Sequence, residues 1–383
     1  MLAEITNLQK KEVKLKPLKI IVSGGGTGGH IFPAIAIANA IKALRPDAEF
    51  LFVGAQGKME MEKVPAAGYK IEGLWISGFQ RKLTMSNLMF PFKVISSLMK
   101  AKQLLNNFKP DAVIGTGGFA SGPMLQVAAN NGVVTVIQEQ NSYPGITNKI
   151  LSKKVNKICV AYPNMEKYFP KEKIITTGNP IRQDIQELEG KRDKGLKTFG
   201  LDTNKKTVLV IGGSLGARTI NESILSCLET LEQNNIQLVW QTGKAYYETA
   251  KQAVSKYEQK GIKAFDFIQK MDEAYAVADI VISRAGASSI SELCVVKKPC
   301  ILIPSPNVAE DHQTKNAMAL VSKDAAVLVK DAEAREKLCS ELLSLINNKE
   351  RCITLSNNIE QLAFKNSATV IAAEILRLIH PSP

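Results

Sequence analysis

The amino-acid sequence predicts an α/β protein of two domains, each with a parallel β-sheet, that face each other across a cleft. Apolar strand-like runs alternate with helix-length amphipathic segments along the chain. Two glycine-rich turns, about half a chain apart, each connect a strand to a helix. The length of 383 residues exceeds one ordinary domain and fits two of roughly 150–200 residues.

Both glycine-rich turns have the composition of an anion-binding site. The first, GGGTGGH at 24–30, follows a predicted strand, and the second, GGSLGAR at 212–218, follows another. Glycine lets the backbone approach a ligand closely, and the N–H groups and positive dipole end of the next helix attract anionic oxygen. Each turn therefore predicts a place for a phosphate-like group.

The remaining elements follow from the same alternation. Strands are predicted at 19–23, 49–53, 112–115, 133–137, 157–161, 207–211, 236–240, 263–267, 279–282 and 300–303. Helices are predicted between them, including 33–44, 122–131, 217–231, 246–258, 287–296 and 311–322, and a final amphipathic segment covers 356–378. We therefore expect a polar leader at 1–17, an N-terminal domain at 18–182, a C-terminal domain at 183–360, and a C-terminal helix at 361–383 that returns to the N-terminal domain.

Bulk composition narrows the class of protein. The formal net charge of +13 is suited to nucleic acid, anionic lipid or a phosphorylated substrate. The sequence has no nucleic-acid-binding motif, so nucleic acid is not predicted. No apolar run reaches the ~18–20 residues that span a bilayer, and residues 1–11 lack a signal-peptide core, so we expect a cytosolic protein. The six cysteines form no Cys-x-x-Cys pair and are expected to stay reduced.

The first glycine-rich turn also allows a dinucleotide dehydrogenase. Gly24, Gly26 and Gly29 satisfy G-x-G-x-x-G, but such a unit needs an acidic residue after the next strand to hold a ribose hydroxyl. Here that strand ends in Gly54-Ala55-Gln56, which argues against a nicotinamide cofactor. Glycines that serve only strand–helix packing are the other alternative, and a third glycine cluster at 115–122 weakens it.

The sequence contains an ordered series of motifs. They are GGTGGHIFPA at 25–34, GTGGF at 115–119, QEQN at 138–141 with TNK at 147–149, GNPIR at 178–182, GGSLGAR at 212–218, RAGASSISE at 284–292 and the pair Gln313 and Asn316. This series resembles the MurG family, the N-acetylglucosaminyltransferases that complete the lipid-linked disaccharide precursor of peptidoglycan. The resemblance covers roughly residues 18–380. It implies the GT-B fold, in which two Rossmann-like domains hold the donor nucleotide mainly in the second and the acceptor in the first.

The resemblance implies an inverting transferase that moves GlcNAc from UDP-GlcNAc to the C4 hydroxyl of MurNAc in undecaprenyl-pyrophosphoryl-MurNAc-pentapeptide. It places the enzyme peripherally on the cytoplasmic face of a bacterial inner membrane. The partners that it implies are the two substrates, the anionic membrane surface, and the cell-wall and division machinery. Two alternatives stay open. One is another GT-B enzyme, such as a glycolipid transferase or a UDP-GlcNAc 2-epimerase, and the other is a non-catalytic scaffold that binds nucleotide sugar.

The departing UDP diphosphate needs positive potential, which many transferases supply with a metal held by Asp-x-Asp. This sequence has no Asp-x-Asp. A helix N-terminus, hydroxyl groups and a guanidinium can replace the metal. Ser214 and Arg182 are the candidates, and by resemblance both contact the donor diphosphate. No metal or other cofactor is therefore expected.

By resemblance, the donor site also uses the turn at 287–292, with Glu292 accepting two ribose hydroxyl hydrogens. Ile268 packs against uracil, and Gln313 reaches the sugar hydroxyls. The family often has two adjacent glutamines there, whereas this chain has His312, whose role stays open. The donor set is Thr27, Gly28, Gly29, Asn141, Arg182, Ser214, Ile268, Ala287, Ser288, Ser289, Ile290, Ser291, Glu292 and Gln313.

Two residues are candidates for the base that deprotonates the acceptor hydroxyl. His30 lies at a helix N-terminus, where the positive dipole favours the neutral imidazole that a base requires. An orienting role without proton transfer is the competing interpretation for His30, and Glu139 is the second candidate base. The acceptor diphosphate is expected at Gly28, Gly29, Gly117, Gly118 and Phe119.

The segment 74–105 mixes apolar side chains with cations, which suits shallow insertion among anionic headgroups. Membrane contact is expected at Phe79, Arg81, Lys82, Leu88, Phe90, Phe92 and Lys93. After about Val94 we interpret the segment as an ordinary amphipathic helix packed on the sheet.

Overall fold

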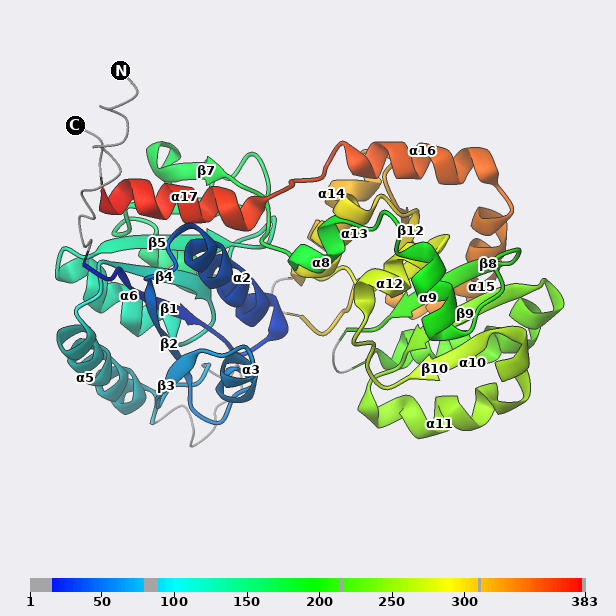
Figure 1. Ribbon diagram of the computed structural model, residues 1–383, viewed down its shortest axis with the longest axis horizontal. Coiled ribbons are helices and arrows are strands. Elements are labelled where there is room, and N and C mark those ends of the chain that lie inside the picture. Colours follow the sequence, from blue (N-terminus) through cyan, green and yellow to red (C-terminus); the bar gives the residue numbers. More distant parts are fainter. Residues whose placement is uncertain (1–15, 79–88, 214–215, 309–310, 381–383) are drawn as a thin grey trace, which may run out of the picture.

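Two parallel sheets form the centres of two lobes in the computed structural model, which describes residues 16–78, 89–213, 216–308 and 311–380 (Figure 1). The first sheet has seven strands in the order β3-β2-β1-β4-β5-β6-β7, and the second has six in the order β10-β9-β8-β11-β12-β13. Their bounds are β1 Lys19–Gly24, β2 Glu49–Ala55, β3 Lys70–Leu74, β4 Ala112–Gly117, β5 Val134–Glu139, β6 Lys157–Val160, β7 Ile174–Thr176, β8 Lys206–Ile211, β9 Ile236–Gln241, β10 Ile262–Phe265, β11 Ile280–Ser283, β12 Cys300–Leu302 and β13 Val327–Leu328. The predicted α/β fold with two parallel sheets is confirmed.

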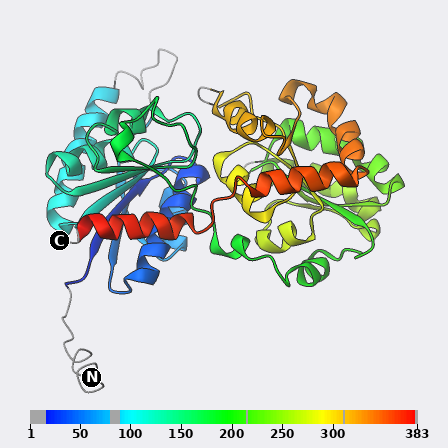
Figure 2. The same ribbon diagram turned by 90° about the horizontal axis from the view of Figure 1, so that it is seen from above.

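Helices connect the parallel strands and cover both faces of each sheet (Figures 1 and 2). In the first lobe they are α2 Gly28–Leu44, α3 Glu60–Ala66, α5 Phe90–Phe108, α6 Ser121–Asn130 and α7 Ile146–Leu151. The helices that follow the first sheet in the chain and accompany the second sheet are α8 Gln183–Gln186, α9 Arg192–Phe199, α10 Arg218–Gln233, α11 Lys244–Val254, α12 Met271–Val277, α13 Ala287–Val296, α14 His312–Val321 and α15 Ala334–Ile346. The chain ends in α16 Lys349–Glu360 and α17 Ser367–Ile379.

The strand order places the functional loops. In each sheet the chain starts at a central strand, adds strands on one side of it, and then returns to add strands on its other side. As a result β1 neighbours β4, and β8 neighbours β11. Ligands of open α/β sheets bind where the order reverses, beyond the carboxyl ends of the strands. Both glycine-rich turns follow these central strands, β1 and β8.

Every predicted strand is present, and the structure contains three further short strands that the sequence did not predict. β3 is a partly exposed edge strand with the mixed sequence KIEGL, and β7 and β13 have three and two residues. Such segments carry too little hydrophobic alternation to be recognised. The prediction of one closing helix at 356–378 is also wrong in detail. The helix is interrupted between α16 and α17, where Asn366 adopts a left-handed conformation with φ of 58°.

The last helix returns to the first lobe, whereas α16 packs on α13 and α15 of the second (Figures 1 and 2). Helix α17 lies against α2, and its Ile371, Ala372 and Ile375 are fully buried in a core shared with Ile37 and Ile41. The first lobe is therefore built from chain segments at both ends of the described sequence.

Two cysteines 112 residues apart form a disulfide. Cys227 of α10 and Cys339 of α15 meet because these helices pack side by side, with the two Cα atoms 5.8 Å apart. This corrects the expectation that all cysteines are reduced, since no local spacing in the sequence brings the pair together. Cys159, Cys294 and Cys300 are buried thiols, and Cys352 is half-buried.

The α17 contact predicts a stability effect at Ile375. We expect Ile375→Ala to lower the free energy of unfolding by about 2–5 kcal/mol, because the substitution leaves a cavity in the α2–α17 core. Val370→Ala is the matched control, since Val370 lies on the same helix and is 45% exposed. Equal denaturant midpoints for the two variants would contradict this packing.

Candidate active site

The first glycine-rich turn is braced from behind by protein groups. Gly25 N–H donates to Gly117 O at 3.3 Å, and Gly26 N–H donates to Glu60 Oε2 at 2.8 Å. The other oxygen of the fully buried Glu60 accepts from Ala55 N–H at 2.9 Å. Two of the turn's amides are therefore used internally. The amides of Gly28 and Gly29 begin α2 and have no carbonyl partner within the helix, so they are available to an anionic ligand.

His30 lies in the first turn of α2 against the glycine-rich turn after β4. Its Nδ1 is 3.0 Å from Gln140 Oε1, and Thr116 Oγ1 donates to its backbone carbonyl at 2.8 Å. A Cβ on Gly117, which has φ of 100°, would lie 2.7 Å from the imidazole, so only glycine fits beside this ring. Loss of solvation lowers the pKa of His30, and the Gln140 hydrogen bond partly offsets that effect. His30 is therefore held as a neutral imidazole near neutral pH.

Glu139 is enclosed by hydrogen-bond donors. Its carboxylate accepts from Asn141 N–H at 3.0 Å, Gly145 N–H at 3.1 Å and Asn148 Nδ2 at 2.9 Å, and its side chain is 2% exposed. Burial raises its pKa, while these hydrogen bonds act in the opposite direction. The geometry makes Glu139 the anchor of the loop that carries Asn141.

That loop touches the second lobe through α14. Asn316 is fully buried, and it donates to Asn141 Oδ1 at 3.1 Å while its Oδ1 accepts from Ser142 N–H at 3.1 Å. The Tyr143 ring lies between two cations, with Lys149 Nζ at 3.9 Å and Lys315 Nζ at 3.7 Å from its centroid. Positive charge from both lobes is thus gathered beside Asn141.

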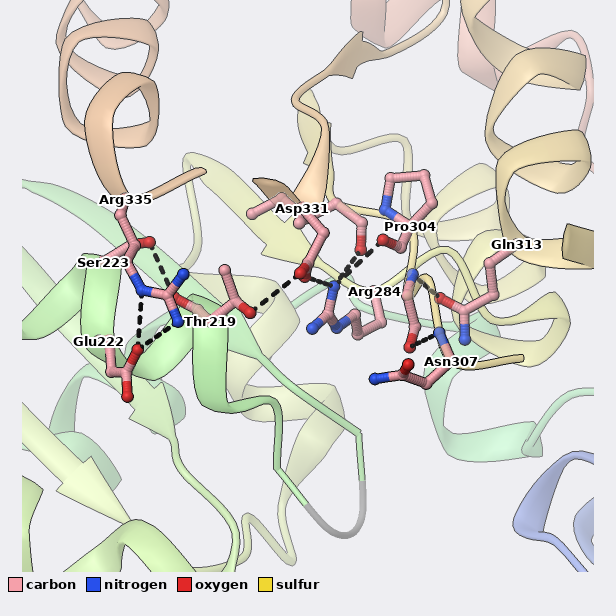
Figure 3. Close-up of polar contacts among 11 residues, drawn as sticks. Thr219, Glu222, Ser223, Arg284, Pro304, Asn307, Gln313, Asp331 and Arg335 are labelled. Atoms are coloured by element: carbon pink, nitrogen blue, oxygen red, sulfur yellow. Dashed lines mark hydrogen bonds and ion pairs between the residues drawn. The ribbon is translucent and has the colours of Figure 1, made fainter. Parts of the chain in front are cut away.

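The second glycine-rich turn leads from β8 into α10, and Ser214 falls outside the described residues. Beside it, Arg284 joins the loop after β12 to the segment after β13 (Figure 3). Its Nη1 donates to the carbonyls of Ile303 at 3.1 Å and Pro304 at 3.2 Å and pairs with Asp331. Asp331 in turn accepts from Thr219 Oγ1 of α10 at 3.0 Å. Arg284 therefore fixes loops around the second turn.

Glu292 projects from α13 toward α12 and the segment between the lobes. Tyr275 OH donates to Glu292 Oε2 at 2.9 Å, and Tyr275 is 1% exposed. Burial raises the pKa of Glu292, and the nearby Arg182 charge and the Tyr275 hydrogen bond lower it. The same burial, with the Glu292 charge, raises the pKa of Tyr275 well above its usual range, so Tyr275 stays a donor.

Two members of the predicted donor set have unsatisfied buried polar atoms. In the described part of the chain, Arg182 Nε and Ser288 Oγ are buried without a hydrogen-bond partner. Arg182 Nε lies 3.7 Å from Asp184 Oδ1, which is too long for a hydrogen bond. Since unpaired buried polar groups are costly, these two atoms are expected to gain partners when a polar ligand is present.

The other predicted donor residues are divided between the two lobes. Ile268 is 3% exposed, and its N–H donates to Gln241 Oε1 at 2.9 Å. Gln313 is the second residue of α14, and its Oε1 accepts from Ser305 N–H at 2.9 Å (Figure 3). The predicted turn forms the first turns of α13, whose residues are Ala287, Ser288, Ser289, Ile290, Ser291 and Glu292. Thr27 is exposed, immediately before α2 in the first lobe.

On the acceptor side, Phe119 is 46% exposed beside Gly118 and Gly117. Of the predicted membrane contacts, Phe79, Arg81, Lys82 and Leu88 lie outside the described residues. Phe92 is 62% exposed at the start of α5, whereas Phe90 and Lys93 are half-buried.

After Val94, α5 packs on the sheet as predicted, but its outer face also carries apolar side chains. Ser97, Ala101, Leu104 and Leu105 do face the core, but Ile95 is 56% and Met99 is 70% exposed. These two lie near Phe92 by helical spacing, so the apolar surface continues along α5. No helix within the described residues is long and apolar enough to span a bilayer.

Sequence reasoning missed the supporting residues Glu60, Gln140 and Tyr275. Gln140 lies inside the QEQN motif, so its position was available, but its partner His30 is 110 residues away. Glu60 and Tyr275 lie on short helices with no motif of their own. Only the fold brings them to the site.

Comparison with known proteins agrees with this arrangement. Residues 20–160 match the glycosyltransferase family 28 N-terminal domain, and residues 207–374 match the glycosyltransferase family 28 C-terminal domain. Two relatives named UDP-N-acetylglucosamine--N-acetylmuramyl-(pentapeptide) pyrophosphoryl-undecaprenol N-acetylglucosamine transferase are strongly similar. That of Flavobacterium psychrophilum is 56% identical over 365 residues, which cover 95% of this chain and 99% of the relative. That of Cytophaga hutchinsonii is 59% identical over 366 residues, covering 95% and 98%.

Solved structures show the same architecture. Acinetobacter baumannii MurG is 26% identical, with a TM-score of 0.75 over 94% of this chain and 100% of that one. A UDP-GlcNAc 2-epimerase from Neisseria meningitidis is 14% identical, with a TM-score of 0.64 over 94% and 99%, which shows the fold alone.

The fold and the two matched domains define a GT-B glycosyltransferase of family 28. Since relatives are more than half identical to it over nearly their whole length, the chain belongs to the MurG family. The resemblance seen in the sequence motifs is thereby confirmed.

Proposed function

We propose that this protein transfers GlcNAc from UDP-GlcNAc to the C4 hydroxyl of MurNAc in undecaprenyl-pyrophosphoryl-MurNAc-pentapeptide, with inversion at the anomeric carbon. This is the step from lipid I to lipid II, the last cytoplasmic step of peptidoglycan precursor synthesis. The near full-length identity to relatives of that name carries the assignment. The arrangement of His30 in one lobe and Glu292 with Arg182 near the other supports it.

The donor would be held mainly by the second lobe. Glu292 is suited to accept ribose hydroxyl hydrogens, because Tyr275 already fixes one of its oxygens and no described residue bonds to the other. Ser288 Oγ and Arg182 Nε supply unpaired polar atoms near the same helix. Burial raises the pKa of Glu292, and the Arg182 charge and the Tyr275 hydrogen bond act against that rise, so both favour the ionised form of the ribose acceptor.

The leaving group would be stabilised without a metal ion. UDP departs as a diphosphate whose negative charge grows in the transition state, and preorganised donors at the site lower that barrier. The N-terminal amides of α10 and the Arg182 guanidinium provide such donors. Ser214, which the sequence motif also assigns to the donor diphosphate, would add a hydroxyl donor to this set.

His30 is the better placed of the two candidate bases. Loss of solvation lowers its pKa, which keeps the ring neutral, and it sits at the N-terminus of α2 beside Gly117. Glu139 is already occupied by N–H donors that hold the Asn141 loop. We therefore assign proton removal from the C4 hydroxyl to His30 and loop positioning to Glu139.

The lipid acceptor requires work at a membrane surface, for which we propose α5 and its neighbours. Phe92, Ile95 and Met99 form an exposed apolar row, and Trp75 is 43% exposed with Lys93 Nζ 5.8 Å from its ring centroid. Apolar side chains beside cations suit peripheral binding to the anionic cytoplasmic face. The cell-wall and division machinery is a further proposed partner.

Steady-state transfer to a short-chain muramyl lipid separates binding from chemistry. We expect Glu292→Gln to raise the donor KM by about 10–100-fold with little change in kcat, because a buried ribose hydrogen bond is lost. Tyr275→Phe should raise the same KM by about 3–10-fold. His30→Ala should instead lower kcat by about 10²–10⁴-fold.

Tyr69→Phe is the matched control for this series, since Tyr69 OH donates to Asn39 Oδ1 at 2.6 Å on the far side of the first lobe's core. It should leave both parameters within about twofold. Full activity in His30→Ala would remove the proposed base, and an unchanged donor KM in Glu292→Gln would remove the ribose contact.

Chelation tests the leaving-group proposal. Because Arg182 and helix amides supply the positive potential, transfer should proceed at an unchanged rate in excess EDTA. Arg182→Lys should lower kcat/KM for the donor, since lysine cannot reproduce the guanidinium fork. Loss of activity in EDTA that one divalent ion restores would contradict metal-independent departure.

Vesicle binding tests the membrane surface. Met99→Glu and Phe92→Glu should weaken binding to vesicles that contain anionic phospholipid, because a charge enters the inserted apolar row. Ile353→Glu is the control, since Ile353 is 50% exposed on α16 of the other lobe. If all three variants bind vesicles as the parent does, the surface has been misplaced.

A further inference from the structure

A row of buried side-chain amides connects His30 in the first lobe to helix α13 in the second. Gln138 is fully buried, and Gln140 and Asn179 are each 2% exposed. Gln138 and Gln140 lie at the end of β5 and just beyond it, and Asn179 belongs to the segment between the lobes. Buried amides are costly unless paired, so their hydrogen bonds define how each one is oriented.

The backbone fixes the orientation of the first amide. Gln140 Nε2 lies 2.6 Å from the carbonyl oxygen of Thr116, which can only accept. The Gln140 nitrogen must therefore point to Thr116, and its Oε1 must face His30 Nδ1 at 3.0 Å. An acceptor at that position requires the proton on His30 Nδ1. The lone pair then lies on Nε2, the ring nitrogen left for a substrate.

The remaining contacts continue in one direction. Gln140 Nε2 also donates to Gln138 Oε1, and Gln138 Nε2 donates to Asn179 Oδ1 at 2.8 Å. Asn179 Nδ2 donates to Gln140 O at 3.0 Å and to Ser291 Oγ at 2.9 Å. Ser291 Oγ ends the chain on the carbonyl of Ala287 at 3.0 Å. Apart from the Asn179 bond back to Gln140 O, each side-chain donor points to the next group on the way to α13. Reversing one amide would therefore place like atoms against each other at its neighbours.

We propose that Gln138, Gln140 and Asn179 are positioning residues that hold His30 with its proton on Nδ1 and couple its orientation to the donor-binding helix α13. This inference rests on the proposed function, because it uses His30 as the base and α13 as the donor helix. Hydrogen bonds in such a chain polarise one another, so a ligand that shifts α13 alters the field at His30. The coupling needs no movement of either lobe.

The charges that face His30 from other elements do not replace this chain. Glu60 of α3 favours the protonated ring, and His312 of α14 disfavours it, but both act more weakly than burial and the Gln140 hydrogen bond. Neither forms a hydrogen bond to the His30 ring among the described residues. The Thr116 backbone carbonyl is a second acceptor beside the ring and also raises the pKa of His30, so Gln140 and Thr116 together favour a ring nitrogen that carries a proton on their side.

Nitrogen NMR of 15N-histidine protein reads the tautomer without any assay of transfer. The chain has 3 histidines, so His30 is assigned by the signal that disappears in His30→Asn. We expect the shifts of a neutral ring protonated at Nδ1. In Gln140→Met we expect a mixture of tautomers, whereas Gln237→Met, which alters another buried glutamine far along the chain, should leave His30 unchanged. A parent ring protonated at Nε2, or a Gln140→Met spectrum identical to the parent's, would overturn the proposal.

A second variant keeps the test informative if methionine disturbs folding. Gln140→Glu preserves shape and still accepts from Nδ1, but its carboxylate stabilises the imidazolium. We expect the His30 pKa to rise by about one unit, and the acid limb of kcat against pH should move up equally, since the base must be unprotonated. An unmoved His30 titration would contradict the assigned contact. If the titration moves and the rate profile does not, the tautomer assignment stands and His30 as the base fails.

The link between lobes is tested with UDP as the probe. In the parent protein, saturating UDP should shift the His30 nitrogen signals through α13 and Asn179. Asn179→Leu removes the donor to Ser291, so the UDP-induced shift should fall by at least half while UDP still binds by calorimetry. An equal shift in parent and variant, or no shift in the parent, would overturn the coupling. Absence of UDP binding in the parent would instead refute the proposed function.

Discussion

Two buried asparagines connect the two lobes by hydrogen bonds, and the arrangement of the site depends on them. Asn179 and Asn316 are 2% and 0% exposed, and each bonds to groups from both lobes. Leaving such a group unpaired costs about 1–3 kcal/mol, so any relative movement that breaks these contacts must replace them. The same two residues set the distance between the Asn141 loop and helices α13 and α14.

Buried carboxylates brace two loops of the first lobe from behind. Glu60 accepts from the Gly26 amide of the first glycine-rich turn, and Glu139 accepts from amides of the loop after β5, so hydrogen bonds within the protein hold both loops. These two carboxylates also place negative charge close to the proposed diphosphate site, which disfavours binding of an anion. Positive groups on the open side, including Arg182 and the lysines at Tyr143, offset that charge. The hydrogen bonds that hold these loops are in place without a substrate, and such preorganisation favours electrostatic stabilisation of the leaving group.

The sequence predicts the sheets and the motif positions because both depend on local pattern. Strands β1 and β8 are apolar runs followed by glycine, and the turn at 284–292 can be read directly from its small residues. The supporting partners cannot be predicted this way. Gln140 meets His30 across 110 residues, and Tyr275 meets Glu292 only because α12 and α13 flank the same strand. The Cys227–Cys339 pair could not be predicted for the same reason, since hydrophobic periodicity indicates a buried helix face but not which residues cover it.

The chain crosses between the lobes twice, and the two crossings touch. Gly178 in the first crossing has φ of 76°, and a Cβ there would lie 2.2 Å from Phe364 Cβ in the second. Asn366 N–H in the second donates to Gln186 Oε1, just after the first, at 3.3 Å. Because both crossings lie together, rotation of one lobe about this point bends both segments at once and leaves α17 on its core. Asn179 immediately follows Gly178, so the amide chain to His30 lies beside the pivot, where a rotation displaces atoms least. A contact placed there can survive small lobe movements that would separate groups farther out.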